Sequence, residues 1–275
     1  RRFCRNKLAI LGLVILIYFV LVSVFAPFLT NYDPNRSNLR NRNLPPSGDH
    51  LFGTDDMGRD IFARTLYGGR ISLSVGLVSV GISLSIGVVL GAVAGFFGGM
   101  FDTVIMRIAD VFYSFPFMIL AITISSIFGP SIYNTMIILG ILSWPSSARL
   151  LRAEFLKLKN TDFALAATTI GANPSRVMFR HILPNAISPL LVSATLGVAS
   201  AILSEAGLSF LGLGVPPPAP SWGNMLNRAR PLHILASMPW MWLPPGIAIF
   251  VIVLSINFVG DGLRDAFDPR QVMNE

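Results

Sequence analysis

Long apolar runs alternate with polar segments along this 275-residue chain. A helix needs about 20 predominantly apolar residues to cross the hydrocarbon core of a bilayer. Six runs approach or exceed that length: Leu8–Leu29, Leu73–Phe97, Val104–Phe128, Ile132–Leu151, Ala186–Leu211 and Trp240–Val259. Pro145 lies inside the fourth run and predicts a kink there. The pattern predicts an all-α integral membrane protein with six transmembrane helices.

The second run carries glycines at helical spacing. Gly87, Gly91 and Gly95 recur every four residues, so they share one face of a helix. In lipid, small residues at this spacing let two helix backbones approach closely. This face is therefore expected to pack directly against another helix.

Basic residues decide the predicted orientation, because loops that face the cytoplasm carry an excess of lysine and arginine. We place the first long loop outside, although it contains several arginines between Arg36 and Arg70, which by themselves would favour the cytoplasmic side. Two clusters outweigh them: Arg1, Arg2, Arg5 and Lys7 before the first run, and Arg149, Arg152, Lys157, Lys159, Arg176 and Arg180 between the fourth and fifth runs. These clusters predict cytoplasmic N and C termini.

The first outer loop divides into two parts. Residues Asn31–His50 are rich in Asn, Pro, Ser and Arg, which predicts irregular structure. Residues Asp56–Tyr67 fit a short amphipathic helix on the membrane surface, capped by Thr54 or Asp55. An ordinary ordered loop fits the same pattern equally well.

The last outer loop, Gly212–Pro239, is rich in proline, which opposes a continuous helix. Trp222, Trp240 and Trp242 lie in it or beside it. Tryptophans at such positions are typical of an interfacial aromatic belt. A contact with a partner protein is the alternative.

Composition agrees with a membrane protein: 53% of the residues are hydrophobic, 13% are charged, and the mean hydropathy is +0.64. Soluble domains have about 25% charged residues. The net charge of +7 does not indicate nucleic-acid binding, because the basic residues form no dense block with interleaved aromatics. Cys4 is the single cysteine, which excludes an internal disulfide; we interpret it as a plain thiol rather than a lipidation site.

The basic tail and first apolar run imitate a signal peptide. The run Leu8–Leu29 is longer than the 7–15 residues typical of a signal-peptide core, and no A-x-A-like site follows it. We expect a retained transmembrane helix.

Motifs for catalysis are missing from the sequence. It contains no G-x-x-x-x-G-K-[ST], H-E-x-x-H, C-x-x-C or G-x-S-x-G motif, so we expect no ATP, metal or hydrolase site in this chain. Energy for any transport must come from a partner or an ion gradient. Glu205 is the one acid deep in a predicted span, and we favour a structural role over a proton site.

The segment from Arg152 to Pro184 is basic and faces the predicted cytoplasmic side. Thr161 or Asp162 can cap a short helix, and Gly171 is placed to end it. Such a helix either enters a groove of a partner or remains solvated. The residue pattern alone does not decide between these alternatives.

This segment resembles the cytoplasmic signature of binding-protein-dependent ABC importer permeases, E-A-A-x3-G-x9-I-x-L-P. Ala166, Ala167, Gly171, Leu183 and Pro184 match it at the right spacing, while Leu165 replaces the glutamate and His181 replaces the isoleucine. Residues His50–Leu73, Ser204–Leu226 and Gly260–Arg270 resemble the dipeptide/oligopeptide/nickel permease family, in its second (C-type) subunit.

The resemblance implies an ABC importer type I permease fold and a transport subunit without ATPase activity. It implies a lipid-embedded heterodimer with a homologous permease subunit, two ATP-binding cassette subunits that use ATP and Mg, and an extracytoplasmic solute-binding protein. The chain itself is expected to bind no cofactor and no nucleic acid. The implied location is a bacterial or archaeal inner membrane.

The resemblance also implies residue roles and boundaries. The implied coupling helix contains Asp162, Phe163, Ala164, Leu165, Ala166, Ala167 and Gly171, and His181, Leu183 and Pro184 close the motif. The implied divisions are residues 1–30 (tail and accessory helix), 31–69 (outer loop), 70–260 (core domain) and 261–275 (cytoplasmic tail). Short peptides are the implied substrates, within a family range that includes nickel chelates and glutathione. The alternatives are a stand-alone ion-coupled transporter and a non-transporting scaffold.

Overall fold

The computed structural model describes Phe3 and residues 6–267, and this part of the chain is built of helices with no named strand. Cys4 and the basic residues Arg1, Arg2, Arg5 and Arg270 lie outside the described residues. The long helices are α1 (Lys7–Val24), α3 (Ile61–Phe97), α4 (Gly99–Tyr113), α5 (Phe117–Phe128), α6 (Ile132–Leu158), α9 (Leu183–Phe210) and α12 (Leu243–Phe267). The shorter elements are α2 (Ala26–Leu29), η2 (Leu39–Asn41), α7 (Asp162–Thr169), α8 (Pro174–Arg176), η3 (Val177–Ile182), α10 (Trp222–Arg228), α11 (Leu232–Ser237) and η4 (Pro239–Met241).

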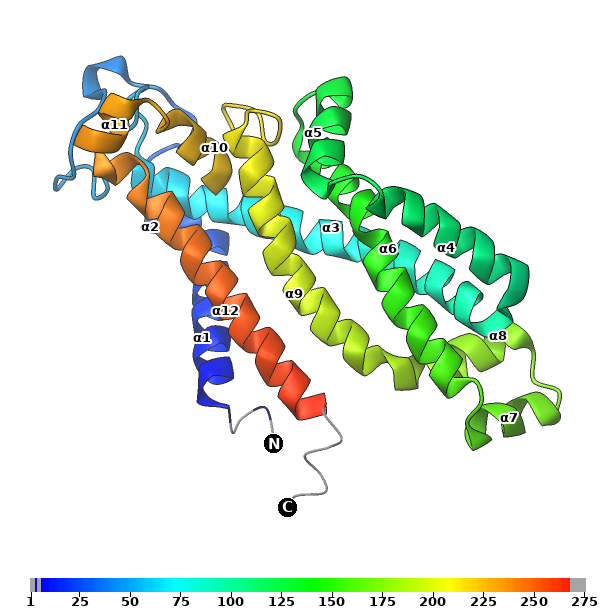
Figure 1. Cartoon of the computed structure of the whole chain (residues 1–275). Helices are drawn as coiled ribbons and strands as arrows, with labels where there is room; N and C mark the ends of the chain where they lie inside the picture. The colour runs from blue at the N-terminus through cyan, green and yellow to red at the C-terminus, as the bar shows by residue number, and fades with distance from the viewer. Residues whose placement is uncertain (1–2, 4–5, 268–275) are drawn as a thin grey trace.

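Helix α3 runs through the whole bundle and organises it (Figure 1). Helices α6 and α9 pack along it, and α1 and α12 pack together beside them. Asn6 Nδ2 donates to Asp265 Oδ2 at 3.0 Å, which joins the start of α1 to the end of α12. The start of α1 and the end of α12 lie at the same end of the bundle as α7, whereas α10 and α11 lie at the other end (Figure 1).

The prediction of a separate amphipathic helix over Asp56–Tyr67 was wrong. Helix α3 begins at Ile61 and continues without a break to Phe97, so the surface helix and the second span are one element. Its N-cap is Asp60, whose Oδ1 accepts from Ala63 N at 2.7 Å. The pattern was misleading because arginines inside this range are buried rather than solvated: Arg64 is 1% exposed.

The close approach predicted for the glycine face is confirmed, and the neighbour is α6. A Cβ built on Gly91 would lie 2.5 Å from Ala148 O, and one built on Gly95 would lie 2.5 Å from Phe155 Cβ. Gly87 meets Ser147 in the same way. These contacts leave no room for a side chain, so glycine is required where the two backbones meet.

The third predicted span, Val104–Phe128, is not one straight helix. The chain bends by 85° between α4 and α5, at Ser114–Pro116. Proline disfavours helical geometry in the residue before it, which explains the break. The fourth predicted span, Ile132–Leu151, is longer than expected, because α6 continues through Pro145 and ends at Leu158.

Within the described residues, four helical segments are long and apolar enough to cross a membrane: α1, α3, the continuous stretch Pro174–Phe210 and α12. The bent pair α4–α5 makes a fifth if it counts as one span. Helix α6, which carries Arg149, Arg152, Glu154 and Lys157 in its second half, falls outside this group. The six crossings and the cytoplasmic termini remain predictions.

The loop at residues 30–60 and the segment at 212–242 cover one end of the bundle, and we call them the cap (Figure 1). Arg228 Nη1 lies 3.1 Å from Asp56 Oδ2, and Arg64 Nη1 donates to Pro34 O at 2.7 Å. The belt prediction was wrong for Trp222, which is 1% exposed and donates from Nε1 to Thr65 O at 3.0 Å. Its ring packs inside the protein, edge-on to Phe19.

Candidate functional site

Helix α7 occupies the segment singled out by the sequence motif and has well-defined ends. It begins at Asp162, with Thr161 in the N-cap position, although the Thr161 hydroxyl donates to Leu158 O rather than capping the helix. It ends at Thr169, and Gly171 follows with φ of +79°. Ala172 N donates to Ala167 O at 3.1 Å and Gly171 N to Thr168 O at 3.0 Å. This is a Schellman motif, so Gly171 ends the helix as predicted.

Helix α7 has one buried and one exposed face. Ala164 and Ala167 are 1% and 6% exposed and pack in an apolar cluster with Phe155 of α6. Val177 and Met178 of η3 and Ala92 of α3 belong to the same cluster. The cluster fastens the helix to the bundle. The small alanines explain how the backbone of α7 comes close to its neighbours.

Exposed apolar side chains lie on the rest of α7 and on Ile170, the residue that follows it. Ile170 is 84% exposed, Leu165 50% and Phe163 40%. Asp162 and Ala166 are also exposed. Of the predicted coupling residues, the structure thus exposes Asp162, Phe163, Leu165, Ala166 and Gly171, while Ala164 and Ala167 serve packing.

The end of the motif connects α7 to α9 through a π-helical turn. Asn173 caps α8 by accepting from Ser175 N at 3.1 Å. His181 lies half-buried in η3, and its carbonyl accepts from Asn185 Nδ2 at 2.7 Å. Leu183 and Pro184 begin α9. Proline is well tolerated there, because the first turn of a helix needs no internal N–H donor. The short elements α8 and η3 thus connect α7 to α9.

Two acidic side chains of α4, Asp102 and Asp110, pair with arginines of α6. Arg152 Nη2 donates to Asp102 Oδ2 at 2.6 Å, and the two side chains form a bidentate pair. Arg149 pairs with Asp110 and stacks its guanidinium 4.3 Å from the centroid of the Tyr113 ring. These pairs hold α4 against α6.

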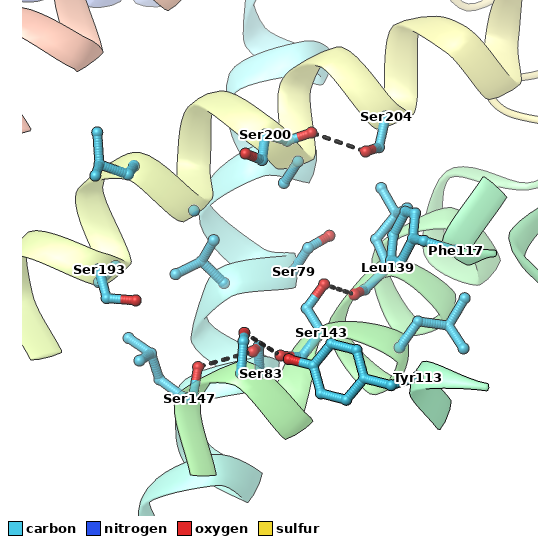
Figure 2. Close-up of a pocket in the computed structure, with 18 residues that line it drawn as sticks. Ser79, Ser83, Tyr113, Phe117, Leu139, Ser143, Ser147, Ser193, Ser200 and Ser204 are labelled. Atoms are coloured by element: carbon cyan, nitrogen blue, oxygen red, sulfur yellow. Dashed lines mark hydrogen bonds between the residues drawn. The ribbon is translucent and has the colours of Figure 1, made fainter. Parts of the chain in front are cut away.

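A cavity of about 420 Å³, lined by serine hydroxyls among apolar side chains, lies between α3, α6 and α9, with Tyr113 of α4 and Phe117 of α5 at its edge (Figure 2). Its polar lining is almost entirely serine: Ser79 and Ser83 from α3, Ser143, Ser146 and Ser147 from α6, and Ser193, Ser200 and Ser204 from α9. None of the described residues that line it is charged. Its volume lies in the range of small-molecule sites.

Several serine protons are already used inside the helices. Ser143 Oγ donates to Leu139 O at 2.7 Å, and Ser204 Oγ donates to Ser200 O at 2.8 Å (Figure 2). Ser146 Oγ donates to Ser143 O at 2.9 Å. A hydroxyl has one proton and two acceptor lone pairs. These three serines therefore offer acceptors to whatever occupies the cavity.

Sequence reasoning missed this cavity. The signal was a pair of serines four residues apart on each of three helices: Ser79 with Ser83, Ser143 with Ser147, and Ser200 with Ser204. Such a pair lies on one helix face. Serine is nevertheless common in membrane helices as a packing residue, so only the three-dimensional arrangement distinguishes a lining from a packing surface.

Glu205 lies next to the cavity but does not face it. It is fully buried and accepts from Ser72 Oγ at 2.8 Å and from Ser209 Oγ at 2.7 Å. Ser209 Oγ in turn accepts from Val215 N of the cap at 3.0 Å. The carboxylate thus joins α3, α9 and the cap, as expected for a structural role. The described residues contain no group of three or more His, Cys, Asp or Glu side chains placed to hold a metal ion.

Residues 87–272 match the family described as binding-protein-dependent transport system inner membrane component, which covers more than half of the chain. The chain belongs to this family. Residues 1–46 match the N-terminal TM domain of oligopeptide transport permease C. The matched core includes α7 and most of the serine-lined cavity of this permease.

Relatives of the permease match over nearly their whole length. The dipeptide transport system permease protein of Alkalihalophilus pseudofirmus is 46% identical, with 97% of this chain and 87% of the relative covered. The oligopeptide transport system permease protein of Bacillus subtilis is 44% identical, with coverage of 98% and 88%.

Solved structures of inward-facing forms of the MetNI methionine ABC transporter share the fold of the permease. One chain has a TM-score of 0.62 at 18% identity, with 76% of this chain and 98% of that chain covered. A second crystal form has a TM-score of 0.59 at 20% identity, with coverage of 74% and 97%. The predicted ABC importer permease fold is confirmed.

Proposed function

We propose that this chain is a permease subunit of an ATP-driven importer of short peptides. The observation that carries the proposal is family membership over residues 87–272, together with relatives named as dipeptide and oligopeptide permeases at 44–46% identity. The fold shared with a methionine ABC transporter supports the same class of function. The chain supplies the membrane path, and partner chains supply the ATP chemistry.

The assembly contains a homologous permease subunit, two ATP-binding cassette subunits and an extracytoplasmic solute-binding protein, in a bacterial or archaeal inner membrane. The ATPase subunits use ATP and Mg, and this chain binds no cofactor. Helix α7 and the helix ends joined by Asn6 and Asp265 face the cytoplasm, and the cap faces outward. The basic residues Arg149, Arg152, Lys157 and Lys159, which lie towards α7, support this orientation.

Helix α7 is the coupling helix in this proposal. Its exposed side chains Phe163, Leu165 and Ile170 suit a groove on an ATPase subunit, because an unpartnered apolar helix face gains free energy when it is buried. Its buried face is fastened to α3 and α6 through the cluster around Phe155. A displacement of the ATPase is thus transmitted to the bundle.

ATP-driven switching requires that α7 contact the two ATPase states differently, because tight binding to both states alike shifts no equilibrium. Closure of the ATPase pair carries α7, and α9 follows through α8 and η3. The cavity then opens alternately to the two sides of the membrane. The serine-lined cavity is this subunit's part of the path.

The test is reconstitution of the complete transporter in proteoliposomes with a labelled dipeptide. Uptake is expected to require ATP and both permease subunits. Leu165→Asp places a charge on the exposed face of α7 and is expected to lower ATP-dependent uptake at least tenfold, with loss of ATPase subunits on co-purification. Leu232→Asp is the matched control, because Leu232 is 81% exposed on α11 at the other end of the bundle.

The outcomes separate the proposals. Wild-type uptake by the Leu165→Asp transporter contradicts the coupling role of α7. Uptake driven by an ion gradient, with this chain alone in the vesicles, contradicts the ATP-driven importer and favours a secondary transporter. If Leu232→Asp also loses the ATPase subunits, the effect of Leu165→Asp does not arise at the α7 surface.

A further inference from the structure

Arg149 of α6 and Asp110 of α4 form an ion pair beside the serine-lined cavity. Arg149 follows Leu142, which lines the cavity, by seven residues, so the two side chains share one face of α6. Asp110 lies one turn before Tyr113 on α4, and Tyr113 points into the cavity (Figure 2). Along α6, Arg149 comes after the residues that line the cavity, so the pair lies on the side of the cavity nearer to α7.

The Tyr113 ring connects this ion pair to the cavity. Tyr113 lines the cavity, and the guanidinium of Arg149 lies 4.3 Å from the centroid of its ring. A cation above an aromatic face is attracted by the ring quadrupole, which holds the guanidinium in place. A ligand that leaves the cavity past Tyr113 therefore meets the charges of Arg149 and Asp110 next.

A second ion pair between the same two helices provides a comparison. Arg152 donates to Asp102 from Nε and Nη2, so both carboxylate oxygens are used, and the side chains are 34% and 19% exposed. Arg149 donates to Asp110 from Nη2 alone, and these side chains are 44% and 48% exposed. In the described part of the chain, Nε and Nη1 of Arg149 have no acceptor, and Oδ2 of Asp110 has only Arg107 Nη1 at 3.8 Å. The Arg149–Asp110 pair thus keeps free donors and a free acceptor.

Both charges of the pair lie within predicted membrane spans, Asp110 in Val104–Phe128 and Arg149 in Ile132–Leu151. Charged side chains in such spans are costly, face the bundle interior or a water-filled space, and mark the paths of substrates and ions. A peptide carries an ammonium group at one end and a carboxylate at the other. A guanidinium binds a carboxylate through paired N–H donors, and a carboxylate accepts from an ammonium group. The free groups of the pair therefore match both ends of a peptide.

We propose that Arg149 and Asp110 form a binding station for the charged ends of a peptide, at the edge of the cavity nearer to α7. The inference rests on the proposed function, because it adds a binding step to the same path. The remaining N–H groups of Arg149 take the carboxylate, and Oδ2 of Asp110 accepts from the ammonium group. Tyr113 is a positioning residue that orients Arg149 and separates the station from the cavity. In the proposed orientation, the station lies on the cytoplasmic side of the cavity.

The first experiment changes one charge of the station at a time. In proteoliposomes with the complete transporter, ATP-dependent uptake of alanyl-lysine and alanyl-glutamate is measured for Asp110→Asn and Arg149→Gln. With Arg107 included, two arginines and one aspartate give a net charge of +1, which becomes +2 in Asp110→Asn and 0 in Arg149→Gln. The ratio of alanyl-lysine to alanyl-glutamate uptake is expected to fall about fivefold in Asp110→Asn and to rise about fivefold in Arg149→Gln, as for unit charges about 4 Å apart in water.

Asp102→Asn is the matched control, because it makes the same substitution in the saturated ion pair. Asp102 lies eight residues before Asp110 on α4, which is about 12 Å along the helix and more than a Debye length at physiological ionic strength. The uptake ratio of Asp102→Asn is expected to stay within about twofold of the wild-type ratio. A ratio does not depend on the amount of folded transporter, and the same binding protein serves every variant.

The second experiment locates the cargo without relying on uptake by the charge variants. The photoreactive residue p-benzoylphenylalanine replaces Tyr113 or, as the control, Tyr133, which is 75% exposed in the first turn of α6 and absent from the lining. In the complete transporter with ATP and labelled alanyl-alanine, light is expected to label the chain from position 113 well above the level from position 133. Adding Arg149→Gln and Asp110→Asn together is expected to lower the labelling from position 113, because the station no longer holds the peptide.

The outcomes separate this inference from the proposed function. If the wild-type transporter takes up neither dipeptide with ATP, the peptide-importer proposal fails, and the station fails with it. If uptake occurs but Asp110→Asn and Arg149→Gln both keep the wild-type ratio, the pair only holds α4 against α6 and the station alone is refuted. If the two variants take up neither dipeptide, the cross-linking decides: labelling from position 113 that equals the control, or that is unchanged by the double substitution, overturns the inference.

Discussion

Replacing Gly91 by alanine tests the contact on which the α3–α6 packing depends. The new Cβ would lie 2.5 Å from Ala148 O and 3.0 Å from Ala148 Cα. Both are backbone atoms of α6, so no rotation of a side chain relieves the clash and the two helices must separate. Overpacking of this kind costs about 1–3 kcal/mol.

Helix propensity acts in the opposite direction, because alanine is more favourable than glycine inside a helix by about 1 kcal/mol. Gly81→Ala is the matched control: Gly81 lies in the same helix, and a Cβ there meets nothing within 4 Å. Both variants gain the same propensity term, so their difference in stability isolates the clash. We expect Gly91→Ala to be less stable than Gly81→Ala by about 1–3 kcal/mol.

The assay is thermal denaturation of the full-length chain in detergent, followed by size-exclusion chromatography of the heated samples. A difference of 1 kcal/mol corresponds to about 2–4 °C in a chain of this size. The Gly91→Ala midpoint is therefore expected to lie several degrees below that of Gly81→Ala. Equal midpoints would refute the argument that backbone contact at Gly91 holds α3 against α6.

Substitutions at two further positions test the helix end and the buried acid. Gly171→Ala is expected to lower the free energy of unfolding by about 1 kcal/mol and to reduce ATP-dependent uptake, because φ of +79° is unfavourable for a residue with a Cβ. Asparagine tolerates this geometry better, so Gly171→Asn is expected to retain more uptake. Equal uptake by the two variants would contradict the strain argument. Glu205→Gln is expected to keep ATP-driven uptake with an unchanged pH dependence, since Gln retains an acceptor for Ser72 or Ser209. Glu205→Ala is expected to lose about 1–3 kcal/mol of stability, measured by the same thermal assay, and a shifted pH profile in Glu205→Gln would favour a proton-carrying role.

The features that were predictable from sequence are those whose signal is local. The glycine spacing at Gly87, Gly91 and Gly95 gave the packing face, and Gly171 gave the end of α7, because both depend on the periodicity or the φ preference of neighbouring residues. The motif placed α7 to within two residues of its observed end at Thr169.

The features that were missed depend on partners far away in the chain. In the sequence, Arg64 has the character of a surface charge. In the structure it donates to Pro34 O and to Pro218 O, and Pro218 is 154 positions away in the chain. In the sequence, Trp222 has the character of an interfacial residue. In the structure its indole N–H donates to Thr65 O, which is 157 positions away in the chain. The cavity was hidden for the same reason, because its serines are scattered over three helices and face one space only after these helices have packed.

The unbroken course of α3 limits how this protein can move. At about 1.5 Å per residue its 37 residues form a rod of roughly 55 Å, much longer than the roughly 30 Å of a bilayer's hydrocarbon core. One extremity is anchored through Asp60 and Arg64, and the other contributes Ala92 to the cluster that carries α7. A rigid helix held at both ends moves as one body, so in the proposed transporter a displacement of α7 by an ATPase subunit would reach the cap. One continuous helix thus joins the cap to the cluster that holds α7.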